Sequence, residues 1–249
     1  MNLNDEGIII SLKKFSDSAS LMKVLTKNHG IYSGLIRLSK KSGNMGVNVP
    51  GNIININWRA RLSEHLGFFN SELVKSRSSL YLNSPINLEI LNSICALLDI
   101  FPEREECEEI YLLANELFNN LNDNFIWPIL YIKFELLFIE KMGYGLDLDS
   151  CAVNGSNKNL SWVSPKSGRA VSNEAAIGWE DRLLRLPKFF KKIDNIISKE
   201  DLIDGLRLTE FFLNKRVYSQ QAKNLPSSRT RLVEYIKNNS VMNVNDEIN

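Results

Sequence analysis

The stretch that decides the fold is IININWR at residues 53–59. Its apolar side chains at positions 54, 56 and 58 alternate with polar side chains at positions 55, 57 and 59. A period of two residues is typical of a β-strand that buries one face and leaves the other in water. We therefore expect a half-buried strand here, of the kind that builds a small barrel.

Similar short runs surround this strand. We expect strands at residues 7–12, 20–26, 31–38, 52–60 and 66–75, separated by turn-forming segments rich in Gly, Asn, Ser and Pro. Five short strands within about 75 residues suit a closed or nearly closed barrel, because closure leaves no long unpaired edge.

The pattern becomes helical from Ile86 onward. Apolar residues recur at helical spacing over 103–121 and about 202–216, and segment 126–142 is apolar on nearly every face, which predicts the central helix of a bundle. That helix should end at Gly143-Tyr144-Gly145 in a left-handed cap. Residues 162–171 read as two short strands around a turn. The predicted organisation is a barrel at 1–80, a helical domain at 81–240 with a hairpin-like insertion at about 146–176, and a disordered tail at 241–249.

Composition places the chain among ordinary globular proteins. Its 249 residues are 44% hydrophobic and 24% charged, which excludes disordered and collagen-like chains. The net charge of +1 hides an uneven distribution. Residues 1–80 hold 11 basic and 5 acidic side chains, residues 81–150 hold 3 and 13, and residues 151–249 hold 16 and 11. This asymmetry suggests modules with different partners, although chance segregation is an alternative.

Cysteine usage and hydropathy bear on the compartment. Three cysteines, an odd number at wide spacing, imply no disulfide framework. The N-terminus has no basic leader region, and the most apolar stretch, 125–139, is interrupted by Pro128, Lys133 and Glu135. We expect a reducing, cytoplasmic location and no membrane span.

Catalytic signals are weak. No phosphate loop, dinucleotide fingerprint, nucleophile elbow or HExxH motif occurs. The two histidines, His29 and His65, lie next to turns and are best explained as surface residues. Asp147 and Asp149 could act as paired carboxylates, but two carboxylates without an acid partner or metal more often cap a turn.

Basic residues of the barrel region give a better signal. Small barrels bind nucleic-acid backbones through cationic loops and strand faces. The candidates for a DNA-binding track are Arg37, Lys40, Lys41, Arg59, Arg61, Lys13 and Lys14. Candidates for base stacking are Tyr32, Trp58, Phe68 and Phe69, although core positions are the more frequent role of such aromatics. A merely solvated basic surface remains the alternative.

Short blocks along the chain resemble a known family in collinear order. They are EGIIIS at 6–11, LTKNHG at 25–30, GLIR at 34–37, PG at 50–51, WRAR at 58–61, LG at 66–67, EL at 72–73, GYGLDL at 143–148, CAV at 151–153, VSPKSGRAV at 163–171 and LPKF at 186–189. Together they resemble the RecO family of bacterial DNA repair and recombination mediators, over residues 6 to about 237.

The resemblance implies an α+β multi-domain protein, with a five-stranded OB-fold barrel followed by a mainly α-helical domain carrying a small zinc-finger-like insertion. The resemblance also implies that the protein is not an enzyme and that it uses no cofactor. Family members bind single- and double-stranded DNA, promote annealing, and work with RecR and single-stranded-DNA-binding protein to load the RecA recombinase. A cytoplasmic, nucleoid-associated location follows from that role.

The insertion departs from the family pattern. Many members hold zinc with two Cys-x-x-Cys pairs, whereas here Cys151 is followed at the fourth position by Asn154, and the second pair is replaced at about Val171 and Glu174. One thiolate cannot complete a tetrahedral site, so we expect an insertion lacking the metal ligands. It should be held by apolar packing of Leu148, Val153, Leu160, Trp162 and Val163.

The resemblance also implies a site for the acidic, apolar-tipped tail of single-stranded-DNA-binding protein. Cations beside apolar side chains would attract such a peptide. The candidates are Arg182, Arg185, Lys188, Arg207, Lys215 and Arg216. The main alternative to a DNA-binding mediator is a non-catalytic protein-interaction adaptor whose acidic helical domain is the functional surface. An enzyme using Asp147 and Asp149 is a third, weaker hypothesis.

Overall fold

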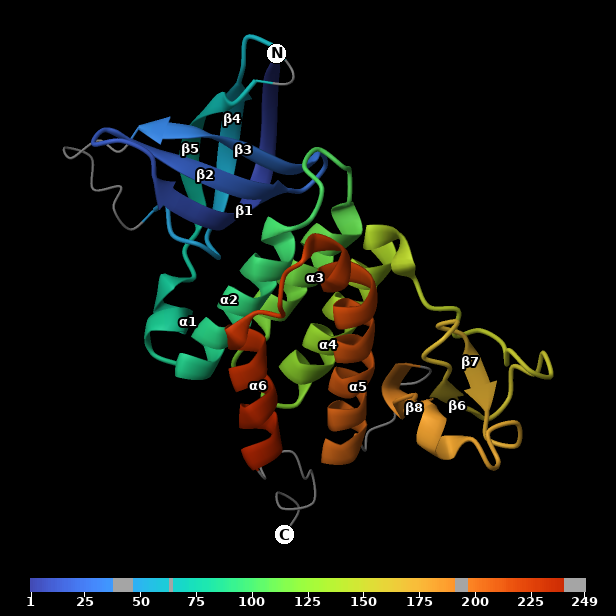
Figure 1. Cartoon of the computed structure of the whole chain (residues 1–249). Helices are drawn as coiled ribbons and strands as arrows, with labels where there is room; N and C mark the ends of the chain where they lie inside the picture. The colour runs from blue at the N-terminus through green and yellow to red at the C-terminus, as the bar shows by residue number, and fades with distance from the viewer. Residues whose placement is uncertain (38–46, 63–64, 191–196, 240–249) are drawn as a thin grey trace. The chain divides into compact units, whose positions relative to one another are not determined.

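The computed structural model describes residues 1–37, 47–62, 65–190 and 197–239 (Figure 1). Spatial contacts divide the chain into two compact units, Met1–Leu121 and Asn122–Asn249. The division at residue 121 rests on contacts between residues. The predicted domain boundary at residue 80 rests instead on the change from a strand-like to a helix-like sequence pattern, and it stays a prediction. The predicted tail, 241–249, lies outside the described residues.

Five strands form the predicted barrel. They are β1 (Asn2–Lys14), β2 (Ala19–Thr26), β3 (Gly30–Arg37), β4 (Ile53–Arg59) and β5 (Gly67–Lys75). The sheet closes in the order β1-β2-β3-β5-β4, with every neighbouring pair antiparallel except β3 and β5. This is the five-stranded barrel of the OB-fold, and the predicted fold is confirmed.

The alternation in β4 places one face of the strand in the barrel core and the other in solvent. Ile54, Ile56 and Trp58 are buried in the barrel core, while Asn55 and Arg59 are exposed. Gly67 provides the space for the largest of these side chains. A Cβ atom at Gly67 would lie 2.2 Å from the Trp58 indole, so a side chain there is incompatible with the core.

Three helices complete the first unit: α1 (Ser78–Leu82), α2 (Pro85–Asp99) and α3 (Glu108–Asn119). The sequence pattern placed the start of the third helix at about residue 103, and this was wrong. Glu103 instead forms a parallel bridge with Ile31, and the backbone N–H of Arg104 donates to the carbonyl of Ile31. Pairing with β3 thus outweighs the helical periodicity of residues 103–107.

A buried arginine joins the barrel to α3. Arg77, which follows β5, is 1% exposed. Its guanidinium donates to the carbonyl of Gly51, at 3.2 Å, and to the side chains of Asn115 and Asn119 on α3. Burial lowers the pKa of Arg77, and the nearby Tyr81, Tyr111 and Glu6 oppose that change. The arginine therefore fixes α3 against the end of the barrel.

The second unit contains α4 (Ile126–Ile139), α5 (Lys199–Phe212) and α6 (Ser227–Asn238). Helix α4 is buried along most of its length, as its composition predicts, and it packs against α5. Wide π-helical turns, η2 (Glu140–Tyr144) and η5 (Leu213–Tyr218), extend α4 and α5, and a short 3-10 turn, η6 (Ser219–Gln221), follows. Gly143 has a φ of 85°, so the predicted left-handed glycine is confirmed.

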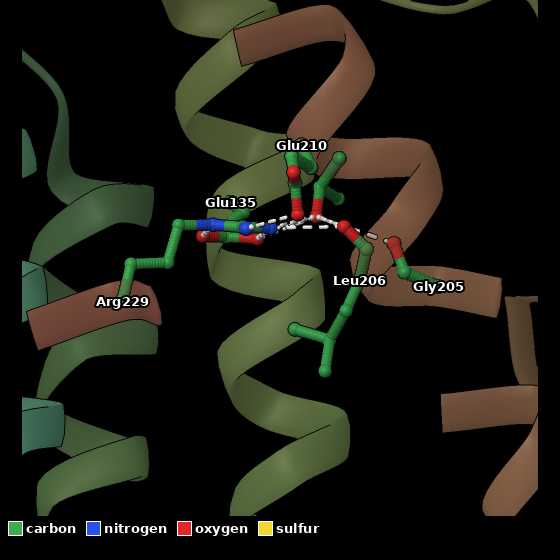
Figure 2. Close-up of polar contacts among 6 residues, drawn as sticks. Glu135, Gly205, Leu206, Glu210 and Arg229 are labelled. Atoms are coloured by element: carbon green, nitrogen blue, oxygen red, sulfur yellow. Dashed lines mark hydrogen bonds and ion pairs between the residues drawn. The ribbon is translucent and has the colours of Figure 1, made fainter. Parts of the chain in front are cut away.

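A buried ion-pair network joins the three helices (Figure 2). The Arg229 guanidinium of α6 contacts both carboxylate oxygens of Glu135 on α4, at 2.7 and 3.0 Å. It also donates to the carbonyl of Leu206 and contacts Glu210, both on α5. The side chains of Arg229 and Glu135 are 2% and 0% exposed. Burial alone would lower the pKa of Arg229, but the charge of Glu135, the hydrogen bonds that the guanidinium donates to it, and the nearby Tyr131 and Glu210 together outweigh burial and raise the pKa.

The insertion is a small three-stranded sheet. Strands β6 (Leu160–Val163) and β7 (Ala170–Ser172) form the predicted hairpin, and β8 (Leu184–Arg185), which the pattern did not predict, pairs with the other side of β6. Short 3-10 turns, η3 (Glu180–Arg182) and η4 (Lys188–Phe190), flank β8. Leu160, Trp162 and Val163 are buried as expected, but Val153 is 71% exposed and does not belong to this core.

Candidate nucleic-acid interface

One outward face of the barrel combines an aromatic ring with cations. Phe68 on β5 lies opposite Arg59 on β4 and opposite Leu35 on β3. Phe68 is 55% exposed, whereas Tyr32, Trp58 and Phe69 are at most 5% exposed. Of the four aromatic candidates, Phe68 is the one whose ring is free to stack on a ligand.

Arg37 and Arg59 lie on either side of that ring. Arg37 is exposed at the end of β3, two residues beyond Leu35, so both side chains leave the same face of the strand. Arg59 is exposed at the end of β4. Arg61 is exposed in the segment that follows β4. These three predicted residues are therefore grouped around β5 by strand register and sequence.

The remaining predicted cations are placed differently. Lys13 and Lys14 are exposed at the end of β1, where Lys13 Nζ lies 3.6 Å from Asp99 and Lys14 Nζ lies 3.0 Å from Asp17. Nearby carboxylates offset part of their attraction for phosphate. Lys40 and Lys41 lie outside the described residues.

Helices of the same unit lie against another side of the barrel. Helix α2 contacts β1, and α3 contacts β1 and β2. The Arg104 guanidinium lies over the rings of Tyr32 and Trp58, 5.5 and 5.4 Å from their centroids. Lys23 of β2 donates to the carbonyl of Asp99 at the end of α2, at 2.9 Å. The face around Phe68 is thus the better candidate for a ligand than the side facing β1 and β2.

Residues considered for catalysis have structural partners. His29 Nδ1 lies 2.8 Å from Asp5, whose side chain is 3% exposed. Burial raises the pKa of Asp5, but hydrogen bonds from His29, Asn28 and Glu6 outweigh burial and lower it. Asp147 pairs with Arg169 at 3.0 Å and also accepts the backbone N–H of Asp149, which is the predicted turn-capping role. His65 is exposed.

The predicted partner-tail cations fall into two groups. Lys215 donates to the carbonyl of Pro165 and so holds the insertion to η5. Arg216 donates to the carbonyl of Tyr144 and lies over the Phe212 ring, so it holds η2 to η5. Arg185 lies 3.8 Å above the buried Trp162 ring. The other group is Arg182, which lies over Trp179, Lys188, and Arg207, which pairs with Asp204; all three are exposed.

The thiol of Cys151, which the resemblance compares with a zinc ligand, is held by backbone hydrogen bonds. Within the described part of the chain, no three His, Cys, Asp or Glu side chains gather closely enough to hold a metal ion. The Cys151 Sγ instead accepts backbone N–H groups of Val153 and Ser172, at 3.4 and 3.2 Å. Burial raises the pKa of this thiol, but backbone N–H groups of Ser172, Asn154 and Val153 outweigh burial and lower it to about 7.

We predict that the purified protein contains no stoichiometric zinc, because the side chains around Cys151 cannot complete a tetrahedral site. Elemental analysis of the full chain measures this directly. A value near one zinc per chain that is lost in Cys151→Ser would contradict the prediction.

Comparison with known proteins agrees with this architecture. The family model for the RecO N-terminal domain matches residues 1–77, and the model for the RecO C-terminal domain matches residues 82–226. The chain belongs to the RecO family. The DNA repair protein RecO of Mesorhizobium japonicum is 36% identical to it, over 92% of this chain and 91% of the relative. RecO of Rickettsia bellii is 38% identical, over 95% of this chain and 97% of the relative.

Membership of the RecO family gives the chain a role in DNA repair and recombination. Among the described helices, none is both long and apolar enough to cross a membrane. Membership of the RecO family also accounts for the sequence blocks that resemble this family.

Sequence reasoning did not single out Asn48, Asn70 or Ser71, which lie beside Phe68 and Arg37 in a surface pocket. The period of two in β5 places Phe68 and Asn70 on one face, so Asn70 follows as a candidate once Phe68 is known to be exposed.

Proposed function

We propose that this protein is a DNA-binding recombination mediator. It binds single- and double-stranded DNA, promotes strand annealing and helps load the RecA recombinase onto DNA covered by single-stranded-DNA-binding protein. RecR is its proposed partner, and the proposed location is the cytoplasm, in association with the nucleoid. The protein acts by binding, without breaking bonds. The observation that carries the proposal is the exposed Phe68 between Arg59 and Arg37 on an OB-fold barrel.

The chemistry of this face fits a polyanion with stacking bases. Arginines neutralise phosphates and release condensed counterions, while an exposed aromatic ring stacks on bases of any sequence. The proposed DNA track consists of Arg37, Lys40, Lys41, Arg59 and Arg61, with Lys13 and Lys14 at its margin. Binding should therefore depend strongly on salt and weakly on sequence.

We expect Arg37→Ala combined with Arg59→Ala to weaken single-strand binding and to flatten its salt dependence. Each lost phosphate contact changes the slope of log affinity against log salt by about 0.7, so the double variant should flatten it by about 1.4. Fluorescence anisotropy of the full chain at several salt concentrations measures both quantities. Lys237→Ala, an exposed cation on α6, is the matched control. An unchanged affinity and slope in the folded double variant would remove these arginines from the track.

The alternative function is a protein-interaction adaptor. A specific observation favours it: α3 and the segment before it expose several acidic side chains around the 48% exposed Leu112. These are Glu105, Glu106, Glu108, Glu109 and Glu116. An adaptor would bind its protein partner through this acidic surface, and its DNA affinity would not respond to the Arg37 and Arg59 substitutions.

We also propose that the tail of single-stranded-DNA-binding protein docks beside Lys188 and Arg207. Reversing both charges, with Lys188→Glu and Arg207→Glu, should weaken binding of a labelled tail peptide, because the peptide is acidic. Lys215 and Arg216 are left unchanged because Lys215 holds the insertion in place and Arg216 holds η2 in place. Lys223→Glu combined with Lys237→Glu, a reversal of two exposed cations elsewhere, controls for net charge. If the double reversal binds the peptide as tightly as the unaltered chain does, the tail docks elsewhere.

A further inference from the structure

A pocket opens on the barrel where β3 and β5 separate. Their parallel pairing consists of Gly34 with Gly67 and Leu35 with Phe68. Beyond these pairs, β3 continues to Arg37 along β2, and β5 continues along β4. The space between the separating strands has a volume of about 450 Å³, within the range of small-molecule sites. It is lined by Leu35, Ile36, Arg37, Asn48, Phe68, Phe69, Asn70 and Ser71.

The lining has an apolar part and a polar part. Leu35 and Phe68 supply apolar surface, and the Phe68 ring is more than half exposed. Asn48, Asn70 and Ser71 supply amide and hydroxyl groups. The Ser71 hydroxyl donates to the Asn48 side-chain oxygen at 3.1 Å, and Asn48 is 6% exposed, so a hydrogen bond links these two side chains in the polar wall. A ligand that fits both parts has a flat aromatic body and a hydrogen-bonding edge.

The charged residues around the pocket indicate what kind of molecule the flat ligand belongs to. Arg37 lines the pocket, and Arg59 lies across β5 next to Phe68. A second hollow, of about 580 Å³, adjoins the first across Asn70 and Ser71, which line both, and is also lined by Asp5, Glu6 and Glu72. Those carboxylates repel phosphate, whereas the two arginines attract it. The first pocket therefore suits a group attached to a phosphate backbone.

We propose that this pocket takes one unstacked nucleobase of a single-stranded nucleic acid. The base stacks on Phe68, its polar edge meets Asn70 and the Asn48–Ser71 pair, and the adjoining phosphates contact Arg37 and Arg59. A base held in a duplex cannot present its face and edge in this way. The pocket thus gives the barrel a preference for unpaired strands, which deepens the proposed function and rests on it.

The test compares two ligands that carry the same charge. One is an oligothymidylate of about 20 nucleotides and the other is an abasic oligomer of equal length, both labelled with fluorescein. We expect the full chain to bind the oligothymidylate on the order of tenfold more tightly, because stacking on an aromatic side chain contributes that much per base. Phe68→Ala and Asn70→Ala should reduce this ratio, with the salt slope unchanged. Phe68→Trp should preserve it.

Leu82→Ala serves as the control, because Leu82 is an apolar side chain on α1 with 84% exposure and lies outside the pocket lining. Equal affinity of the unaltered chain for both oligomers would overturn the base pocket and leave backbone binding intact. A normal ratio in both Phe68→Ala and Asn70→Ala would also overturn it. Failure to bind either oligomer would overturn the pocket together with the proposed DNA binding.

Discussion

Arg229→Met should lower the free energy of unfolding of the second unit by about 3–5 kcal/mol, because it leaves the Glu135 carboxylate buried and unpaired. The substitution keeps most of the side-chain volume, so the loss reports the charge rather than a cavity. Urea denaturation of the full chain, followed by far-UV circular dichroism, measures the change.

Two further variants separate the charge effect from general damage to the helices. The double variant Glu135→Leu with Arg229→Met should have a free energy of unfolding closer to that of the unaltered chain than Arg229→Met alone has. Replacing both charges removes the unpaired carboxylate. Arg207→Ala breaks an exposed pair with Asp204 and should cost less than about 1 kcal/mol. Equal stability of Arg229→Met and Arg207→Ala would show that the network of Figure 2 contributes nothing beyond a surface pair.

Arg77→Met should destabilise the first unit by about 3 kcal/mol. The substitution leaves the Gly51 carbonyl and the Asn115 side-chain oxygen without a charged donor in a buried region, and it removes one of the two charged donors to the Asn119 side chain. Thermal unfolding of the full chain, followed by circular dichroism, measures this loss. We also expect weaker DNA binding near the melting temperature, because the barrel and α3 share this arginine.

Lys75→Ala is the matched control for Arg77→Met. Lys75 also donates to the Asn119 side chain, at 2.8 Å, but it is exposed at the end of β5. Water can replace its hydrogen bond, so the expected loss is below about 1 kcal/mol. A loss in Lys75→Ala as large as that in Arg77→Met would assign the effect to Asn119 rather than to the buried guanidinium.

The barrel was predictable from the sequence because local alternation and turn residues indicate the strands and the segments between them. The segment of residues 103–107 was not, because its helical spacing competes with pairing between Glu103 and Ile31, residues far apart in sequence. The third strand of the insertion was also missed. Its two residues, Leu184 and Arg185, are too few to show a period, and their pairing with β6 is a tertiary contact.

The candidate site, too, was predictable from the sequence only in part. The basic residues at the ends of β3 and β4 could be proposed from sequence, because charged residues at strand ends are exposed. Which aromatic side chain is free could not, since Phe68 and Phe69 are neighbours and a shift of one residue in register exchanges their faces. The network of Arg229 with Glu135 depends on how three helices pack, and no local pattern indicates it.

Photo-crosslinking tests the central claim most directly, that the barrel face around Phe68 binds nucleic acid. The full chain is mixed with single-stranded DNA that carries bromodeoxyuridine, irradiated, digested and analysed by mass spectrometry. We expect the crosslinks to concentrate in peptides that contain Arg37, Arg59 or Phe68, and to disappear at high salt. Crosslinks confined to the helical segments after residue 81, with none in the barrel, would contradict the account.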